Sequence, residues 1–285
     1  MNKQQIVVGI DIGGSHITVA PVDLTSGKII TEGTFRGEVN SKGSVEEVIQ
    51  NWGTVITSCI NFCGATKLGI AMPGPFDYEK GIALIKDNNK YEALYGLNVK
   101  ELLAQSLNLT TTDVLMKNDA GCFLQGEAVS GAARNYSRGI GMTLGTGIGT
   151  AFMENSLADD ASMWCSPFKE GVAEDYISTL WFEQQYFQRT GLSKSVKDMA
   201  LTHDQDEVAQ ALFLEFAQNF GEFIVGFAQQ RKPEVIVVGG NIMKSSQLFM
   251  PQVMEILQSH DICIPVRQAE LGEEAAIIGA ASLHR

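Results

Sequence analysis

Two glycine-rich segments stand out because each lies between two β-branched apolar runs. Gly13-Gly14-Ser15 follows the run of residues 6–11, and Gly145-Thr146-Gly147 follows the run of residues 140–144. A glycine turn in a β-hairpin lets backbone N–H groups approach a phosphate closely. Asp11, just before the first turn, could hold the water shell of a Mg²⁺ ion. Two such turns at equivalent places favour phosphate binding. The simpler alternative is that the glycines only form tight hairpins.

Two other phosphate-binding loops fit this sequence poorly. A P-loop requires Gly-Lys followed by Ser or Thr, and the only Gly-Lys pair, Gly27-Lys28, is followed by Ile29. A dinucleotide-binding loop runs from a strand into a helix, whereas residues 15–22 alternate with the period of a second strand. A further glycine pair, Gly239-Gly240, follows the strand-like run 234–238 and strengthens the phosphate interpretation.

Strands and helices alternate around these turns. The hydrophobic pattern predicts strands at 6–11, 15–22, 31–39, 67–72, 114–116, 140–144, 150–153, 234–238 and 262–266, and helices at 45–62, 99–107, 120–133, 208–230, 248–258 and 274–283. Both halves follow the same order, which predicts an internal duplication of topology. We therefore expect two α/β domains with mixed sheets covered by helices and a ligand-binding cleft between them.

The composition is that of a globular protein and restricts its partners. The 285 residues are 45% hydrophobic, and 21 basic against 33 acidic residues give a net charge of −12, which disfavours nucleic-acid binding. No apolar stretch reaches the roughly 18 residues that span a bilayer. Residues 1–5 lack the apolar core of a signal peptide. We therefore expect a cytoplasmic protein without membrane association.

The five cysteines are scattered along the chain, which indicates reduced thiols. Cys59 and Cys63 lie four residues apart on a predicted helix and could share a metal ion. No second pair of ligands has matching spacing, so buried cysteines are the better interpretation.

Seven segments form an ordered series over nearly the whole chain. They are Gly9-Ile10-Asp11-Ile12-Gly13-Gly14-Ser15, Gly69-Ile70-Ala71-Met72-Pro73-Gly74-Pro75, Asn118-Asp119-Ala120, Leu144-Gly145-Thr146-Gly147-Ile148-Gly149, Glu174-Asp175-Tyr176-Ile177-Ser178, Val238-Gly239-Gly240-Asn241 and Ala275-Ala276-Ile277-Ile278-Gly279-Ala280-Ala281. This series resembles the ROK family of sugar kinases, within the hexokinase–actin–Hsp70 superfamily. The resemblance implies two duplicated ribonuclease-H-like domains. The smaller would comprise residues 1–119 and the C-terminal helix 274–285, and the larger residues 120–273 with a helical insertion at about 155–202.

The resemblance also implies a function and a role for each matched residue. The reaction would be ATP-dependent phosphoryl transfer to a hydroxyl of a hexose-type sugar, by a cytoplasmic homodimer. Asp119 would be the general base, and Asn118, Glu174 and Gly74 would bind the sugar. Gly13, Gly14 and Ser15 would contact the transferred phosphate, Gly145, Thr146 and Gly147 the inner phosphates, and Gly239, Gly240 and Asn241 the adenosine. Asp11 would bind Mg²⁺ through water.

General chemistry agrees with these roles, because phosphoryl transfer needs positioning, charge neutralisation and a base rather than a covalent group. For Asp119 alone, a helix N-cap would be the simpler interpretation. The other motifs favour catalysis.

Residues 162–173 depart from the family pattern. Where many members have a Cys-rich zinc loop, only Cys165 remains, so we expect no zinc site. The family's Glu-x-Gly-His motif, which grips the sugar, aligns with Ser162-Met163-Trp164-Cys165. Glu170 could replace it, or could lie in a surface turn. Sugar hydroxyls without partners would cost about 1–3 kcal/mol each, so we expect glucose to be a poor substrate.

Three functions compete. The leading one is a glucokinase-like sugar kinase that uses ATP, with polyphosphate as an open alternative donor. The second is a catalytically weak sugar- or nucleotide-binding protein with an eroded sugar site. The third is a transcriptional repressor of this family, which would need a helix-turn-helix domain before the first strand. That strand is expected to begin already at Ile6, which disfavours this function.

Overall fold

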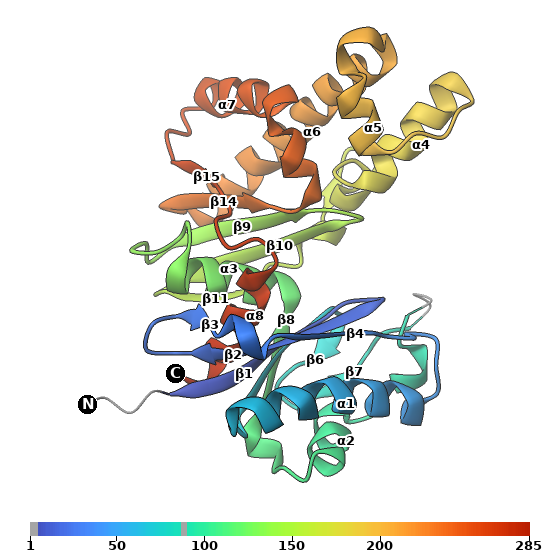
Figure 1. The fold of residues 1–285 in the computed structure, drawn as a ribbon. Helices are drawn as coiled ribbons and strands as arrows, with labels where there is room; N and C mark the ends of the chain where they lie inside the picture. The colour runs from blue at the N-terminus through green and yellow to red at the C-terminus, as the bar shows by residue number, and fades with distance from the viewer. Residues whose placement is uncertain (1–4, 87–89) are drawn as a thin grey trace. The chain divides into compact units, whose positions relative to one another are not determined.

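The computed structural model describes residues 5–86 and 90–285 and forms two compact units (Figure 1). The first unit comprises Met1–Arg134, Ala158–Asp160 and Glu273–Arg285, and the second Asn135–Leu157 and Ala161–Gly272. Helix α3 (Asp119–Ser130) falls in the first unit, whereas the boundary predicted at residue 119 puts it in the second domain. That boundary stays a prediction.

The first unit contains a mixed six-stranded sheet. Its strands are β1 (Ile6–Ile12), β2 (His16–Asp23), β3 (Lys28–Ile29), β4 (Phe35–Glu38), β5 (Leu68–Met72) and β8 (Val114–Asn118). The order is β3-β2-β1-β5-β8, and β4 also pairs with β2. Strand β1 is antiparallel to β2 and parallel to β5, which is parallel to β8. The carboxyl ends of β1, β5 and β8 therefore meet at one edge, where ligands bind in open α/β sheets.

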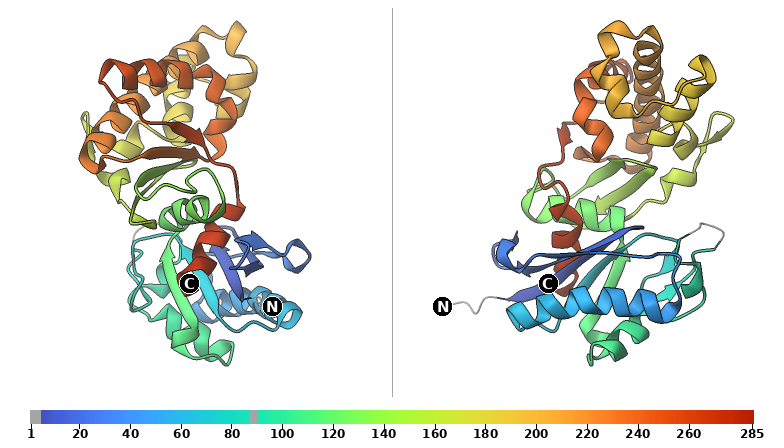
Figure 2. Two further views of the ribbon diagram at one scale, coloured as in Figure 1. Left: turned by 90° about the vertical axis from the view of Figure 1, so that its left-hand side faces the viewer. Right: turned by 45° about the vertical axis from the view of Figure 1, so that its right-hand side comes forward.

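Helices cover both faces of this sheet (Figure 1). One face packs against α1 (Val45–Cys63), with α2 (Val99–Ser106) beside it. Ser44 caps α1, and Val48, Trp52, Ile56 and Cys59 are buried at helical spacing. The other face packs against α8 (Glu274–Ala281), which lies side by side with α3 (Figure 2). A small hairpin, β6 (Phe76–Asp77) and β7 (Ile82–Ala83), follows β5.

The second unit repeats the strand topology of the first. Strands β9 (Gly139–Leu144) and β10 (Ile148–Glu154) are antiparallel, and β9, β14 (Val235–Gly239) and β15 (Val266–Gln268) run parallel in that order. The series β10-β9-β14-β15 thus corresponds to β2-β1-β5-β8. The predicted α/β architecture with duplicated mixed sheets is confirmed.

Helices and short strands complete the second unit. The helices are α4 (Thr179–Thr190), α5 (Val196–Leu201), α6 (Glu207–Arg231) and α7 (Met250–Ser259). The strands β12 (Pro167–Phe168) and β13 (Gly171–Val172) form a short hairpin. Strand β11 spans Leu157–Asp160, and its residues Ala158–Asp160 group with the first unit. On α6, the side chains of Phe216, Phe220, Phe223 and Phe227 are buried in the core. None of the described helices is both long and apolar enough to cross a membrane.

Local predictions were wrong at two places. The expected strand 31–39 begins with a 3-10 helix, Thr31–Gly33, and only Phe35–Glu38 is extended. A Cβ atom on Gly33 would lie 2.5 Å from the Pro21 ring, so this part of the chain packs closely against β2. The expected strand 262–266 is instead Val266–Gln268. Pro265 has no N–H to donate and only accepts a bond from Ile236 N, at 3.0 Å.

Candidate active site

The carboxyl edge of the first sheet brings two predicted acidic residues together. In the strand register, Asp11 pairs with Ala71 of β5, and the adjacent Met72 pairs with Asn118 of β8. Asp119 follows Asn118 directly. The charge of Asp119 contributes to the pKa of Asp11, so the two carboxyl groups interact electrostatically.

Asn118 caps helix α3. Its Oδ1 accepts hydrogen bonds from the N–H groups of Ala120 (2.8 Å) and Gly121 (3.3 Å). Its Nδ2 donates to the Tyr78 hydroxyl (3.2 Å), which itself donates to the Met72 carbonyl (2.9 Å). The buried Asn118 side chain is therefore fixed, and the capping role that Asp119 might have had belongs to its neighbour.

Asp119 remains accessible to solvent at the first turn of α3, and its Oδ1 accepts a bond from Ala120 N (2.9 Å). The pKa of Asp119 is raised, mainly because surrounding protein disfavours the charged form. The N–H of Ala120 opposes this change, and the negative charge of Asp160 adds to it. A carboxylate with a raised pKa is a better proton acceptor.

Asp160 was not predicted to belong to this site. Its segment is held by β8 and α3: Lys117 Nζ donates to the Ala158 carbonyl, and Ala158 N donates to Gln125 Oε1 (2.8 Å). A Cβ atom on Gly121 would lie 3.2 Å from Asp160 N, so the segment passes close to the start of α3.

Asp11 is mostly buried, and its pKa is raised to about 7. Desolvation is the largest cause, followed by the charges of Asp119 and Glu273, while Arg36 lowers the pKa. Within residues 5–86 and 90–285, no group of three or more His, Cys, Asp or Glu side chains could enclose a metal ion. Carboxylate oxygens near a phosphate site still fit Mg²⁺, which keeps several water ligands and is usually held by one or two carboxylates.

The first glycine turn contacts His16, Tyr91 and Lys90. Gly13 N donates to His16 O (2.8 Å), and the Tyr91 hydroxyl donates to Gly13 O. A Cβ atom on Gly14 would meet the side chain of Lys90. Ser15 and His16 are exposed.

The second unit places the other glycine segments at the carboxyl ends of β9 and β14. Gly145 N donates to Gly147 O (3.0 Å), and Thr146 is exposed. Gly240 has φ 93°, and a Cβ atom on it would lie 2.3 Å from Leu144 O, so only glycine fits there. Asn241 is exposed and begins a 3-10 helix, Asn241–Leu248.

Glu174 lies against the second glycine turn. Its Oε2 accepts a hydrogen bond from Ile148 N (3.1 Å), and a Cβ atom on Gly147 would lie 1.9 Å from the same oxygen. Glu174 thus belongs to the second unit and shapes its turn, while Asn118, Asp119 and Gly74 belong to the first. A Cβ atom on Gly74 would lie 3.1 Å from the Tyr78 hydroxyl.

The altered segment 162–173 has few buried polar groups. Ser162 and Cys165 are exposed, and Cys165 Sγ donates to Ser162 O (3.3 Å). Glu170 is exposed in the turn between β12 and β13, where the surface-turn interpretation puts it.

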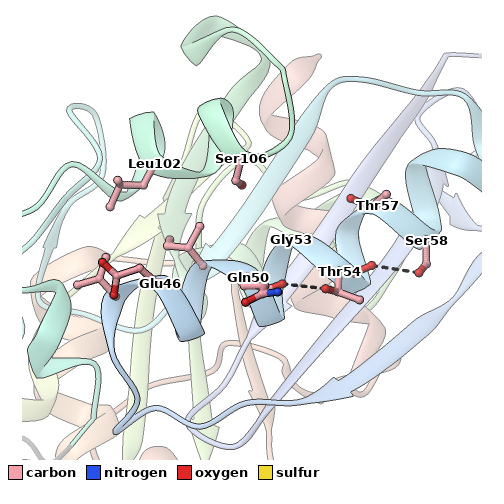
Figure 3. A pocket seen from close by; sticks show the side chains of 10 residues that line it. Glu46, Gln50, Gly53, Thr54, Thr57, Ser58, Leu102 and Ser106 are labelled. Carbon is pink, nitrogen blue, oxygen red and sulfur yellow. Dashed lines mark hydrogen bonds between the residues drawn. The ribbon is translucent and has the colours of Figure 1, made fainter.

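A groove of about 770 Å³ lies on the first unit between α1 and α2 (Figure 3). Its lining includes Glu46, Gln50, Thr54, Leu102 and Ser106, and it contains none of the predicted site residues. The predicted site residues therefore lie outside this groove.

Sequence reasoning missed Tyr78, Lys90 and Asp160. Each reaches a predicted site residue through tertiary contacts, and none belongs to a local motif. The sequence carried no signal that could have found them.

Comparison with known proteins gives a consistent result. The model of the ROK family matches residues 7–160 and 156–285. A glucokinase from Thermotoga maritima is 25% identical, covering 97% of this chain and 96% of the relative. The N-acetylgalactosamine kinase AgaK from Shewanella sp. is 26% identical, covering 96% and 95%.

Solved structures share the fold. A ROK family glucokinase from Streptomyces griseus, in complex with glucose and AMPPNP, superimposes with a TM-score of 0.79 at 21% identity. The match covers 98% of this chain and 99% of that protein.

Proposed function

Because the chain belongs to the ROK family, we propose that it is a kinase that transfers the γ-phosphoryl group of ATP to a hydroxyl of a hexose-type sugar. Relatives of full length are a glucokinase and an N-acetylgalactosamine kinase, and a structural neighbour binds glucose and AMPPNP. The observation that carries the proposal is the environment of Asp119: an accessible carboxylate with a raised pKa, at a helix start that Asn118 already caps.

In this proposal Asp119 is the general base. Its carboxylate accepts the proton of the sugar hydroxyl as that oxygen bonds to the γ-phosphorus and the bond to the ADP oxygen breaks. Asn118 and Gly74 bind the sugar beside it, and Tyr78 fixes the Asn118 amide. Glu174 supplies a further sugar contact, as family resemblance implies. Asp119, Asn118 and Gly74 together orient and deprotonate the sugar hydroxyl.

The glycine segments hold the nucleotide. Gly13, Gly14 and Ser15 contact the transferred phosphate, Gly145, Thr146 and Gly147 the inner phosphates, and Gly239, Gly240 and Asn241 the adenosine. The requirement for glycine at 240 supports the assignment of that turn, because a side chain there would collide with the end of β9. Asp11 holds Mg²⁺ through water, and the ion neutralises phosphate charge when bound.

The altered segment 162–173 bears on which sugar is used. Ser162 is short and Cys165 is a weak donor, so neither replaces the glutamate and histidine of the family motif. We expect glucose to bind weakly, with a KM above the ordinary range of about 1 μM–1 mM, and another sugar to be preferred. A cytoplasmic location and a homodimer belong to the same proposal, and the homodimer is tested by the mass in solution.

The test is ADP release by the purified protein with ATP and Mg²⁺ across a panel of glucose, mannose, N-acetylglucosamine, N-acetylgalactosamine and N-acetylmannosamine. We expect release that depends on at least one sugar and yields its phosphate ester. Parallel reactions with polyphosphate in place of ATP distinguish the two donors. Nucleotide binding without turnover on any sugar would instead support the binding protein with an eroded sugar site.

A further inference from the structure

Lys90 lies directly over the first glycine turn. A Cβ atom on Gly14 would lie 2.9 Å from Lys90 Cδ and Cε and 3.0 Å from its Nζ, so the lysine side chain fills the space that a side chain at position 14 would occupy. The ammonium group is thus in contact with the turn whose backbone is proposed to bind the transferred phosphate. Glycine at position 14 is what permits this approach.

The neighbouring Tyr91 anchors this lysine. Tyr91 is 1% exposed and packs edge-on against the buried Trp52, with ring centroids 5.3 Å apart. Its hydroxyl donates to the Gly13 carbonyl, and its backbone N donates to Ser41 O (2.6 Å). Burial raises the pKa of Tyr91, so the hydroxyl stays protonated and donates at neutral pH.

The backbone at Tyr91 is held in an uncommon conformation. Its φ of 56° is left-handed, which a residue other than glycine adopts only when surrounding contacts fix it. Tyr91 contacts the turn through its hydroxyl, and Lys90 lies against Gly14 with the end of its side chain. The backbone from which the Lys90 side chain extends is therefore held beside the turn by the contacts of Tyr91.

The charges around this edge favour a role for Lys90 with an anion. Arg36 pairs with Glu273 and Lys117 with Asp159, both at 3.7 Å. Lys90 is exposed and forms no ion pair with any residue in the part of the chain that the structure describes. The carboxyl groups of Asp11 and Asp119 lie at the same edge and attract no anion, so a phosphate group there needs a cation.

We propose that the Lys90 ammonium binds the phosphoryl group that is transferred, at the Gly13-Gly14 turn, and stabilises its charge during transfer. This inference rests on the proposed kinase function. It assigns to Lys90 the neutralising contact that phosphoryl transfer requires beside the metal ion. The contact exists with ATP and is lost with ADP, because ADP lacks the transferred group.

The test compares AMPPNP with ADP, each with Mg²⁺, by calorimetry on the full chain. Lys90→Met keeps the length of the side chain and removes its charge, and we expect it to weaken AMPPNP binding about ten- to hundred-fold, as for loss of a charged hydrogen bond. ADP binding should change less than about twofold. Lys90→Arg should retain most of the affinity for AMPPNP. Lys86→Met is the matched control, because Lys86 is exposed on the same segment and lies over the Tyr95 ring, 5.8 Å from its centroid.

Sugar-dependent turnover gives a second readout, and kcat of Lys90→Met should fall about a hundredfold. If Lys90→Met binds AMPPNP as the wild type does, or loses AMPPNP and ADP equally, the inference is wrong. If Lys90→Met loses affinity for AMPPNP but the wild type phosphorylates no sugar, the kinase function is wrong. The phosphate contact of Lys90 is then still supported.

Discussion

At the residue scale, the raised pKa of Asp119 predicts the pH dependence of turnover. A general base acts only when it has lost its proton, so kcat/KM should fall as the pH drops through the pKa of Asp119, above the ordinary value of about 3.9. Asp160→Asn removes a negative charge that raises this pKa, and should move the acidic limb of the profile to lower pH. Asp159→Asn is the control, because the Asp159 carboxylate pairs with Lys117. An unchanged limb in Asp160→Asn would contradict this account of the base.

The raised pKa of Asp11 predicts that stability depends on pH. Its pKa is about 7 in the folded protein and about 3.9 when unfolded, so folding takes up a proton between these values and stability falls as the pH rises through them. Asp11→Asn removes the charge, and the free energy of unfolding at pH 8 should rise by on the order of 1–4 kcal/mol. At pH 4 the two proteins should differ little. Denaturant unfolding in EDTA measures both, and an equal difference at the two pH values would contradict the prediction.

At the element scale, glycines let α8 pack backbone to backbone against its neighbours. Cβ atoms added to Gly9, Gly69 and Gly279 would lie 2.3 Å from Ile277 O, 1.9 Å from Ala280 O and 1.8 Å from Cys122 O. Three elements, β1, β5 and α3, thus meet the last helix at van der Waals distance. The close packing ties the C-terminal segment to the strand that carries Asp11 and to the helix that begins at Asp119.

Gly279→Ala should therefore destabilise the protein by about 3 kcal/mol, because backbone atoms cannot move aside as a flexible side chain can. Gly226→Ala is the matched control: Gly226 lies inside α6, and an added Cβ atom would meet nothing within 4 Å. Alanine is the better helix former, so this control should gain about 0.5–1 kcal/mol. Urea midpoints distinguish the two, and a neutral Gly279→Ala would show that α8 does not pack as described.

Elements with strong local patterns could be predicted from the sequence, and elements that depend on pairing could not. The spacing of Val48, Trp52 and Ile56 predicts α1 closely because one face of that helix is buried. Strand β15 was expected too early, since Pro265 interrupts an apolar run that otherwise resembles a strand. The two-residue strand β3 is defined by its pairing with β2 and has no pattern of its own.

At the scale of the whole molecule, the same distinction holds for the site. Asp119 and the glycine turns lie in short motifs at strand ends, so the repeated topology predicts their positions. Tyr78, Lys90 and Asp160 come from a hairpin, a loop and a strand whose approach depends on tertiary packing. The sequence also did not show that Asn118 caps α3, so that Asp119 is not needed as the cap.

The purified protein should contain no stoichiometric zinc. Cys165 is exposed, and its Sγ bonds to a backbone carbonyl rather than lying among other ligands. Elemental analysis of protein purified without chelators measures this directly. One zinc ion per chain would contradict the expectation and would require ligands outside the segment 162–173.

Transfer of labelled γ-phosphate from ATP to sugar, by the wild type and by Asp119→Asn, tests the central claim most directly. Asparagine keeps the shape of the side chain and cannot accept the hydroxyl proton. The account predicts sugar-dependent transfer by the wild type, a loss of at least about a hundredfold in the variant, and unchanged affinity for AMPPNP. A variant that keeps more than about a tenth of wild-type transfer would contradict the assignment of Asp119 as the base.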